Sequence, residues 1–221
     1  MFDALLLMAG SGKRTKLNYN KVLFKVKNKP LFIHSLEKFL SIEECKKIIL
    51  VINKNDEEEI LNYLRPYPKE KITLTYGGFE RQDSVYAGIK CAESDYVLIH
   101  DAARPLITKD LILNIYENTV KYKAAIPSYQ AIDTIKELKD GKLITLDRSK
   151  LYNIQTPQGV TKDLFIKVIE LAKNENYYAT DDVALLEKYL QLSPKLVQGS
   201  FYNIKVTTEE DLKYIEKLIE E

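Results

Sequence analysis

The strongest constraint on this chain is an alternation of short apolar runs with segments of helical periodicity. The apolar runs are bounded by turn residues, a pattern that favours β-strands. They cover residues 4–8, 47–52, 72–76, 96–100 and 124–127. Because their apolar character is nearly continuous, they are typical of strands that are covered on both faces of a sheet.

Between these runs, apolar residues recur three or four positions apart, as they do on one face of a helix. Phe32, Leu36 and Phe39 show this spacing within residues 31–40. Comparable segments are residues 56–64, 84–91 and 110–121. Strands that alternate with helices predict a three-layer α/β fold with a mainly parallel sheet, in which ligands bind beyond the carboxyl ends of the strands.

Two later segments depart from this alternation. Residues 131–138 and 142–146 are β-prone and flank Asp140-Gly141, which indicates a hairpin. We expect this hairpin to project from the domain as an arm. The last segment, 208–221, combines a capping-box spacing of Thr208 and Asp211 with apolar residues at helical spacing, which predicts a closing amphipathic helix.

Composition narrows the function. The chain has 221 residues, with 33 Lys and Arg against 32 Asp and Glu, so its formal net charge is +1. This length predicts one domain over residues 1–221, and the balanced charge gives no support to a nucleic-acid partner. Cys45 and Cys91 have no metal-ligand spacing, which favours a reducing cytoplasm. No run approaches the roughly 20 apolar residues of a membrane helix, and the first run is interpreted as a strand, not a signal peptide.

The loop after the first run combines glycines with cations. Gly10 and Gly12 let backbone N–H groups approach a ligand, and Lys13 and Arg14 favour a polyanion such as a triphosphate. A tight turn with solvated cations explains the same residues equally well. Thr15 stands where a dinucleotide fingerprint starting at Gly10 needs glycine, and Arg14 where a P-loop needs Ser or Thr, so neither motif applies.

Three further segments carry candidate residues. His100 to Pro105 place the Asp101 carboxylate and the Arg104 guanidinium three positions apart at a strand end, as a ligand site or as a structural ion pair. The segment 77–84 places two glycines at a strand end before a helix, either as part of the ligand site or as a simple turn with Ser84 as the helix N-cap. For Asp83 we favour the simple turn. Asp181 and Asp182 open a helical stretch, so N-terminal capping accounts for them as well as catalysis does.

Taken together, the motifs resemble the 2-C-methyl-D-erythritol 4-phosphate cytidylyltransferase family, in the family's own order. They are A-G-x-G-x-R at 9–14, Lys21, G-G-x-x-R-x-x-S at 77–84, H-D-A-A-R-P at 100–105, D-T at 133–134, D-R at 147–148, Q-T-P-Q at 155–158, T-D-D at 180–182 and N-I-K-V-T at 203–207. An ordered set of this kind is far more specific than a single glycine loop. Asn20 stands where many relatives have proline, Phe79 where an acidic residue is common, and the segment 127–133 looks longer than usual.

The resemblance implies a Rossmann-like nucleotidyltransferase domain with a projecting β-arm, which works as a homodimer on CTP and Mg²⁺ in non-mevalonate isoprenoid synthesis. It implies that Ala9, Gly10, Ser11, Gly12, Lys13, Gly78 and Ser84 surround the nucleotide, with Arg14 and Lys21 at its phosphates. It also implies that Asp101, Arg104, Thr134, Arg148, Thr156 and Lys205 hold the polyol phosphate. Arg14, Lys21, Arg148 and Lys205 are the expected catalytic residues, and Asp101 either coordinates the metal or accepts a hydroxyl of the polyol. The arm, residues 128–150, is expected to cross to the other subunit, so that Thr134 and Arg148 complete the neighbour's site.

Two other functions fit parts of the pattern. Ribitol 5-phosphate cytidylyltransferases are similar in their fold and CTP loop, although Ala102-Ala103 and Asp83-Ser84 favour the methylerythritol enzyme. A catalytically silent nucleotide-binding module on the same scaffold is the second alternative. Retention of both Arg14 and Lys21 argues against it.

Overall fold

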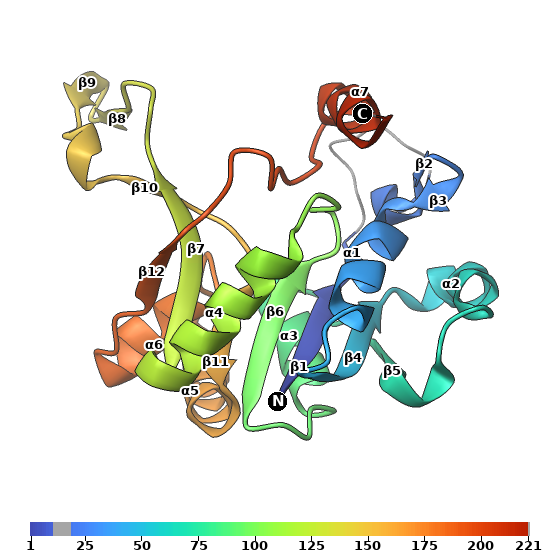
Figure 1. Ribbon diagram of the computed structural model, residues 1–221. Helices are drawn as coiled ribbons and strands as arrows, with labels where there is room; N and C mark the ends of the chain where they lie inside the picture. Colours follow the sequence, from blue (N-terminus) through green and yellow to red (C-terminus); the bar gives the residue numbers. More distant parts are fainter. Residues whose placement is uncertain (11–18, 221) are drawn as a thin grey trace.

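The centre of the protein is an eight-stranded mixed sheet, seen here in a computed structural model that describes residues 1–10 and 19–220 (Figure 1). The strand order is β10-β7-β11-β6-β1-β4-β5, and β12 pairs with β7. Strands of one direction are β1 (Phe2–Leu7), β4 (Cys45–Ile52), β5 (Ile72–Tyr76), β6 (Tyr96–Asp101), β7 (Ala124–Gln130) and β12 (Lys195–Gln198). The antiparallel strands are β10 (Tyr152–Ile154) and β11 (Gln158–Thr161). The predicted mainly parallel sheet is therefore confirmed.

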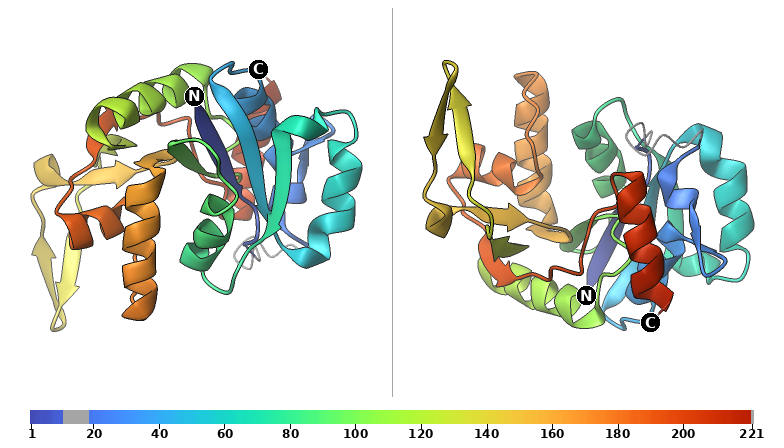
Figure 2. Two further views of the ribbon diagram at one scale, coloured as in Figure 1. Left: turned by 90° about the horizontal axis from the view of Figure 1, so that it is seen from below. Right: turned by 90° about the horizontal axis from the view of Figure 1, so that it is seen from above.

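Helices cover both faces of this sheet (Figure 2). One face carries α1 (Leu31–Leu40), α2 (Glu57–Leu64), α4 (Lys109–Tyr122) and α7 (Glu209–Glu220). The other carries α3 (Arg81–Ile89), α5 (Lys162–Asn174) and α6 (Val183–Leu190). Leu6 belongs to the core on the first face and Leu5 to the core on the second, because successive side chains of a strand point to opposite faces. This double burial explains the continuous apolar runs and confirms the three-layer prediction.

Within the central sheet and its helix layers, the sequence prediction does not include α5, β10, β11 and β12. Helix α5 does show a helical pattern in the sequence, because its buried residues recur at helical spacing: Phe165, Val168, Ile169 and Ala172. The three strands are short, and their pairing with β6 and β7 involves residues far away in the sequence. Such strands depend on tertiary partners more than on their own periodicity.

The predicted arm exists, with corrected boundaries. Its strands β8 (Lys136–Lys139) and β9 (Lys142–Thr145) pair antiparallel, and Asp140 and Gly141 both have positive φ, as the tight hairpin turn requires. The first strand begins at Lys136, so the prediction of a strand from residue 131 is wrong. The Ala131 N–H donates to the Leu151 carbonyl, which continues the pairing of β7 with β10. Strand β7 likewise extends past residue 127 to Gln130, which makes segment 127–133 the stem of the arm.

Smaller elements complete the chain. They are the two-residue strands β2 (Lys25–Val26) and β3 (Lys29–Pro30), and the 3₁₀ turns η2 (Lys21–Leu23), η3 (Lys54–Asp56), η4 (Lys69–Lys71) and η5 (Arg148–Lys150). At the start of α7, Asp211 accepts from the Thr208 N–H and donates its own N–H to the Thr208 hydroxyl, which confirms the predicted capping box. Within residues 1–10 and 19–220, no helix has the length and apolar character to span a membrane.

Candidate functional site

A cleft of about 540 Å³ opens at the carboxyl ends of β1, β4, β5 and β6. These strands are neighbours in the sheet, and the chain leaves β1 through α1 on one face but reaches β6 through α3 on the other. A reversal of this kind leaves a crevice at the strand ends. The cleft is lined by Leu7, Met8, Ala9, Gly10, Lys21, Val22, Asn53, Gly78, Phe79, Glu80, Arg81, Ser84, Asp101, Ala103 and Lys205. The structure therefore has a cleft at the strand ends, where the sequence predicts that ligands bind.

One part of the cleft is the turn between β5 and α3. A Cβ on Gly77 would lie 2.4 Å from the Ala9 Cβ, so only glycine allows this turn to pack against the first loop. The Gly78 N–H donates to the Ser84 Oγ at 3.2 Å, which closes the turn. Helix α3 begins at Arg81, so the prediction that Ser84 is its N-cap is wrong. Asp83 does act in capping, because its carboxylate accepts from the Glu80 N–H at 3.1 Å.

Lys21 reaches the cleft from η2, which Asn20 fastens to the end of β1. The Asn20 Nδ2 donates to the Met8 carbonyl at 2.6 Å and to the Asp56 carboxylate at 2.8 Å. Its Oδ1 accepts from the Val22 N–H at 3.3 Å, as an N-cap does. These bonds hold Lys21 beside Ala9 and Gly10 in the cleft lining. Ser11, Gly12, Lys13 and Arg14 lie outside the described residues.

Asp101, the last residue of β6, is surrounded by cations. Its carboxylate lies 2.7 Å from the Lys205 Nζ and 3.5 Å from the Arg81 Nε, with the Arg104 Nε at 4.0 Å. Burial by itself would raise the pKa of Asp101, but these positive charges outweigh burial and hold the pKa well below its ordinary value. Asp101 therefore stays ionised and acts as a hydrogen-bond acceptor, not as an acid.

Arg81 is joined to Asp182 as well, a contact that the sequence reasoning missed. Its two terminal nitrogens lie 2.7 and 2.8 Å from the two Asp182 oxygens. Burial would lower the pKa of Arg81, but Asp182 and Asp101 raise it. Asp182 makes no side-chain capping bond, so the capping prediction is wrong for it, whereas Asp181 accepts from the Ala184 N–H at 2.9 Å. No local pattern could reveal a pair that spans 101 positions.

Asp182 should accordingly be a stabilising residue. It is only 3% exposed, and Asp182→Ala would leave the partly buried Arg81 guanidinium without its bidentate partner. We expect the variant to lose about 3 kcal/mol of unfolding free energy, measured by urea denaturation. Asp181→Ala is the matched control and should lose about 1 kcal/mol, as a lost capping bond does. Equal losses in the two variants would contradict this assignment.

Thr156 and His100 form the floor behind Asp101. The Thr156 hydroxyl accepts from the Asp101 N–H at 3.1 Å. It also lies 3.1 Å from the His100 Nδ1, and it donates to this nitrogen because the other nitrogen of the neutral ring faces a carbonyl oxygen and must be the donor. The His100 Nε2 then carries the proton that is donated to the Arg104 carbonyl at 3.3 Å. Burial lowers the pKa of His100 to about 4, so the ring is neutral. His100 is therefore a neutral hydrogen-bonding residue at the end of β6.

The segment that carries Lys205 is tied to the turn after β6. The Val206 N–H donates to the Ala103 carbonyl at 2.8 Å, and the Arg104 Nη1 donates to the Asn203 carbonyl at 2.6 Å. These bonds bring Lys205 next to Asp101, although 104 positions separate the two in the sequence (205 − 101). The Arg104 side chain itself lies mostly buried just behind the cleft lining.

Two predicted residues lie elsewhere in the same chain. Thr134 and Arg148 are exposed residues of the arm and are absent from the cleft lining. The Arg148 guanidinium donates to the Ile132 carbonyl within the arm. Figure 1 shows the arm standing away from the strand ends of β1, β4 and β6. The fold of one chain thus does not bring Thr134 and Arg148 to Asp101.

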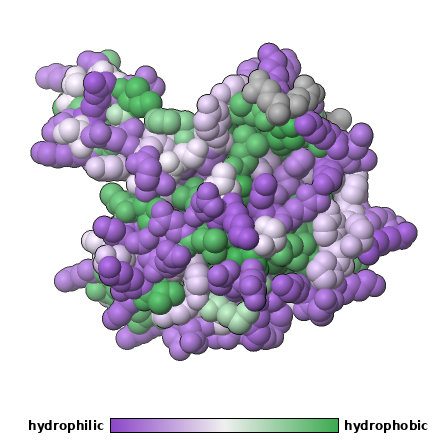
Figure 3. Space-filling model, viewed as in Figure 1, coloured by the Kyte–Doolittle hydropathy of each residue, from purple (hydrophilic) through white to green (hydrophobic). Residues whose placement is uncertain are grey.

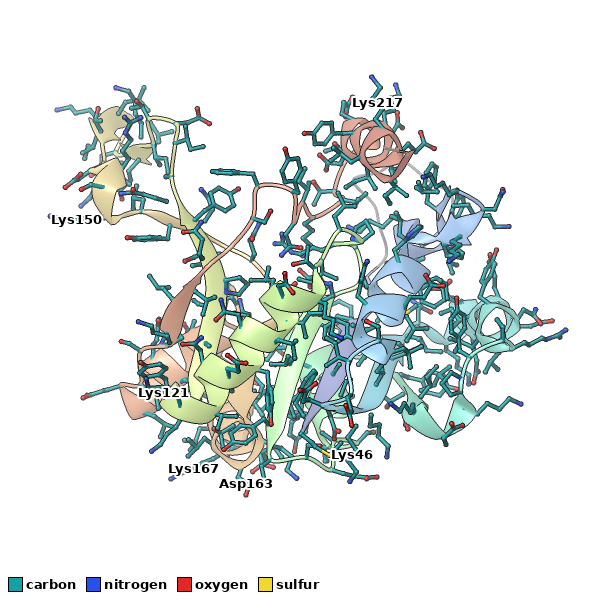
Figure 4. The ribbon with its side chains drawn as sticks, in the orientation of Figure 1. Lys46, Lys121, Lys150, Asp163, Lys167 and Lys217 are labelled. Atoms are coloured by element: carbon teal, nitrogen blue, oxygen red, sulfur yellow. The ribbon has the colours of Figure 1, made fainter. Side chains whose placement is uncertain are left out.

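The cations of the cleft differ from those of the rest of the surface. Figure 4 shows Lys46, Lys121, Lys167 and Lys217 at the periphery, where they extend outward. Lys21 and Lys205 instead converge on one cleft with Arg81. In the described part of the chain, no group of three or more His, Cys, Asp or Glu side chains could hold a metal. The arrangement is suited to binding phosphates and hydroxyls through cations, glycine turns and one fixed carboxylate.

The profile of the 2-C-methyl-D-erythritol 4-phosphate cytidylyltransferase family matches residues 2–221. Proteins of that name from Aquifex aeolicus and Bacillus thuringiensis are 40% and 36% identical to this chain. Each alignment covers 99% of this chain and 98% of the relative.

Solved structures agree with this likeness. The structure of 4-diphosphocytidyl-2C-methyl-D-erythritol synthase from Anaerococcus prevotii superposes with a TM-score of 0.90 at 31% identity, over 100% of this chain and 99% of that one. The Francisella tularensis 2-C-methyl-D-erythritol 4-phosphate cytidylyltransferase gives a TM-score of 0.82 at 29% identity, over 98% of each chain.

Proposed function

Since this chain belongs to the 2-C-methyl-D-erythritol 4-phosphate cytidylyltransferase family, we propose that the cleft at the strand ends is where it carries out that reaction. The enzyme transfers the cytidylyl group of CTP to 2-C-methyl-D-erythritol 4-phosphate, which releases pyrophosphate and forms the cytidine diphosphate polyol for isoprenoid synthesis. The observation that supports the site is the convergence of Gly10, Gly78, Lys21, Asp101 and Lys205 on one cleft from separate segments.

The chemistry needs charge neutralisation more than proton transfer. A phosphate oxygen of the polyol forms a bond to the α-phosphorus of CTP, and the bond from that phosphorus to the pyrophosphate oxygen breaks. The attacking oxygen is already ionised near neutral pH, so no general base is required. Lys21 and Arg14 are proposed to stabilise the negative charge that crowds around the α-phosphorus. Ala9, Gly10, Ser11, Gly12, Lys13, Gly78 and Ser84 are proposed to hold the nucleotide.

Lys205 and Asp101 are proposed to hold the acceptor. An ammonium group has three N–H donors, so Lys205 can bond the Asp101 carboxylate and still donate to the acceptor phosphate. The other oxygen of the ionised Asp101 lies 3.5 Å from the Arg81 Nε, and its second lone pair can accept a hydroxyl hydrogen of the polyol. Arg104 and Thr156 support this pair from behind, through the carboxylate and the backbone of Asp101. Holding the phosphate in line with the α-phosphorus contributes several kcal/mol to catalysis.

Mg²⁺ is proposed to arrive on the triphosphate. The described residues fit a metal that is held mainly by substrate phosphates, because the Asp101 carboxylate is already surrounded by Lys205, Arg81 and Arg104. When bound, the metal would neutralise part of the triphosphate charge. The task that remains for the chain is to place the cations of Lys21 and Lys205 around the reacting phosphates.

The arm is proposed to act between two copies of the chain. Its exposed apolar side chains include Leu138 at 70% and Leu143 at 65% exposure, and Figure 3 shows hydrophobic surface on the arm at the upper left. A two-stranded hairpin is at best marginally stable alone, so a surface of this kind favours a partner. We infer one domain over residues 1–221 whose arm, residues 128–150, brings Thr134 and Arg148 to the neighbour's cleft. The free thiols of Cys45 and Cys91 are in keeping with a cytoplasmic enzyme.

The direct test offers CTP and Mg²⁺ with either 2-C-methyl-D-erythritol 4-phosphate or ribitol 5-phosphate. We expect rapid pyrophosphate release with the first acceptor, little with the second, and none in excess EDTA, because the triphosphate charge must be neutralised before an anion attacks. Pyrophosphate is measured by a coupled assay. Faster release with ribitol 5-phosphate would establish the alternative enzyme, and no release with either acceptor would favour a silent nucleotide-binding module.

A further inference from the structure

An aromatic ring stands in the cleft without a role in the chemistry above. Phe79 lines the cleft and is 96% exposed. It follows Gly78 in the turn between β5 and α3. An exposed phenylalanine keeps a large apolar surface in water, which contact with a ligand would cover favourably. The position therefore points to a ligand group that is itself flat and weakly polar on its faces.

The backbone on both sides of Phe79 is fixed. The Gly77 N–H donates to the Ile52 carbonyl at 2.9 Å, and the Gly78 N–H donates to the Ser84 Oγ at 3.2 Å. On the other side, the Glu80 N–H donates to the Asp83 carboxylate at 3.1 Å. The ring is thus carried on an ordered turn, so a ligand that packs on it has little backbone to order. Preorganisation of this kind favours binding.

The cations and the Asp101 carboxylate of the cleft suit a different part of the ligand. Lys21, Arg81, Asp101 and Lys205 are charged and are matched to phosphates and hydroxyls. The flat part of a nucleotide is its base. The turn that carries Phe79 also packs against the first loop, because a Cβ on Gly77 would lie 2.4 Å from the Ala9 Cβ. Phe79 therefore lies near the loop proposed to hold the nucleotide.

We propose that Phe79 stacks against the cytosine base of bound CTP and thereby sets the affinity for the nucleotide. This inference rests on the proposed position of CTP in the cleft. Stacking uses the face of a base and not its edges, so it adds affinity for any pyrimidine nucleotide and does not distinguish cytosine from uracil. Selection of cytosine would then fall to hydrogen-bonding groups of the loops.

The test compares Phe79→Ala, Phe79→Leu and Phe79→Tyr by calorimetric titration with CTP and with UTP, in the absence of the acceptor. Because base stacking on an aromatic ring is a substantial part of binding, we expect the Kd for CTP to rise about tenfold in the Ala and Leu variants. The Tyr variant should stay within about twofold of the wild type, since its ring stacks equally well. The Kd for UTP should rise by the same factor as that for CTP.

Two measurements separate stacking from other effects. The KM for 2-C-methyl-D-erythritol 4-phosphate and the thermal unfolding midpoint should not change, because Phe79 is exposed and does not belong to the core. Tyr122→Ala, which removes an exposed aromatic ring at the end of α4, is the matched control and should bind CTP normally. A wild-type Kd in Phe79→Ala or Phe79→Leu would overturn the stacking role alone, provided that the wild type releases pyrophosphate. A wild type that neither binds CTP nor releases pyrophosphate would overturn the proposed site as well.

Discussion

Lys21→Ala is expected to slow pyrophosphate release by roughly 100-fold or more while the protein remains folded. Lys21 lines the cleft and is held there through Asn20, whose amide bonds the Met8 carbonyl and the Asp56 carboxylate. An ammonium group fixed in this way is proposed to stabilise charge that develops at the α-phosphorus during the attack. Its loss should therefore reduce kcat much more than it reduces the affinity for 2-C-methyl-D-erythritol 4-phosphate.

The control for this prediction is a lysine outside the cleft. Lys38 is exposed on α1, and Lys38→Ala should leave kcat unchanged. Circular dichroism and thermal unfolding report whether the Lys21→Ala variant is folded. A folded Lys21→Ala enzyme with a kcat close to that of the wild type would remove Lys21 from the mechanism.

Mixing two inactive variants should restore activity if the arm acts across the dimer. In Arg148→Ala the arm residue is lost, and in Lys21→Ala the cleft residue is lost. In a mixed dimer, one site combines the intact Lys21 of the first chain with the intact Arg148 of the second. Random exchange of equal amounts makes half of the dimers mixed, with one working site of two, so about a quarter of wild-type activity should return. The readout is pyrophosphate release after exchange has been verified.

A second mixture provides the matched control. Lys21 and Lys205 line the same cleft of one chain, so Lys21→Ala mixed with Lys205→Ala leaves every site of every dimer defective. No activity should return in this mixture. If the Arg148→Ala mixture also stays inactive despite exchange, or if the active enzyme sediments as a monomer, then Arg148 does not complete a neighbouring site.

Apolar runs, turn residues and a capping box allowed several strands, one hairpin and one helix start to be predicted from the sequence. The continuous apolar runs at β1, β4, β5 and β6 predict strands that are buried on both faces, because each residue of such a strand faces a helix layer on one side or the other. The Asp140-Gly141 turn predicts the hairpin, since these residue types adopt the positive φ that the turn needs. Thr208 and Asp211 predict the start of α7, because in a capping box each side chain accepts the backbone N–H of the other residue.

Only the tertiary structure decided which distant residues meet. Arg81 and Asp182 form a partly buried bidentate pair, and Lys205 reaches Asp101, through strand pairing and loop contacts between far parts of the chain. The N-cap of α3 also belongs to Glu80 and not to Ser84, because the helix already begins at Arg81 and the Ser84 N–H donates to the Glu80 carbonyl. Periodicity and turn chemistry act over a few residues, so the sequence by itself determined β1, β4, β5, β6, most of the helices and the hairpin turn, but not β10, β11 and β12. Ion pairs and cleft walls depend on which strand ends become neighbours in the sheet, and that is a property of the whole fold.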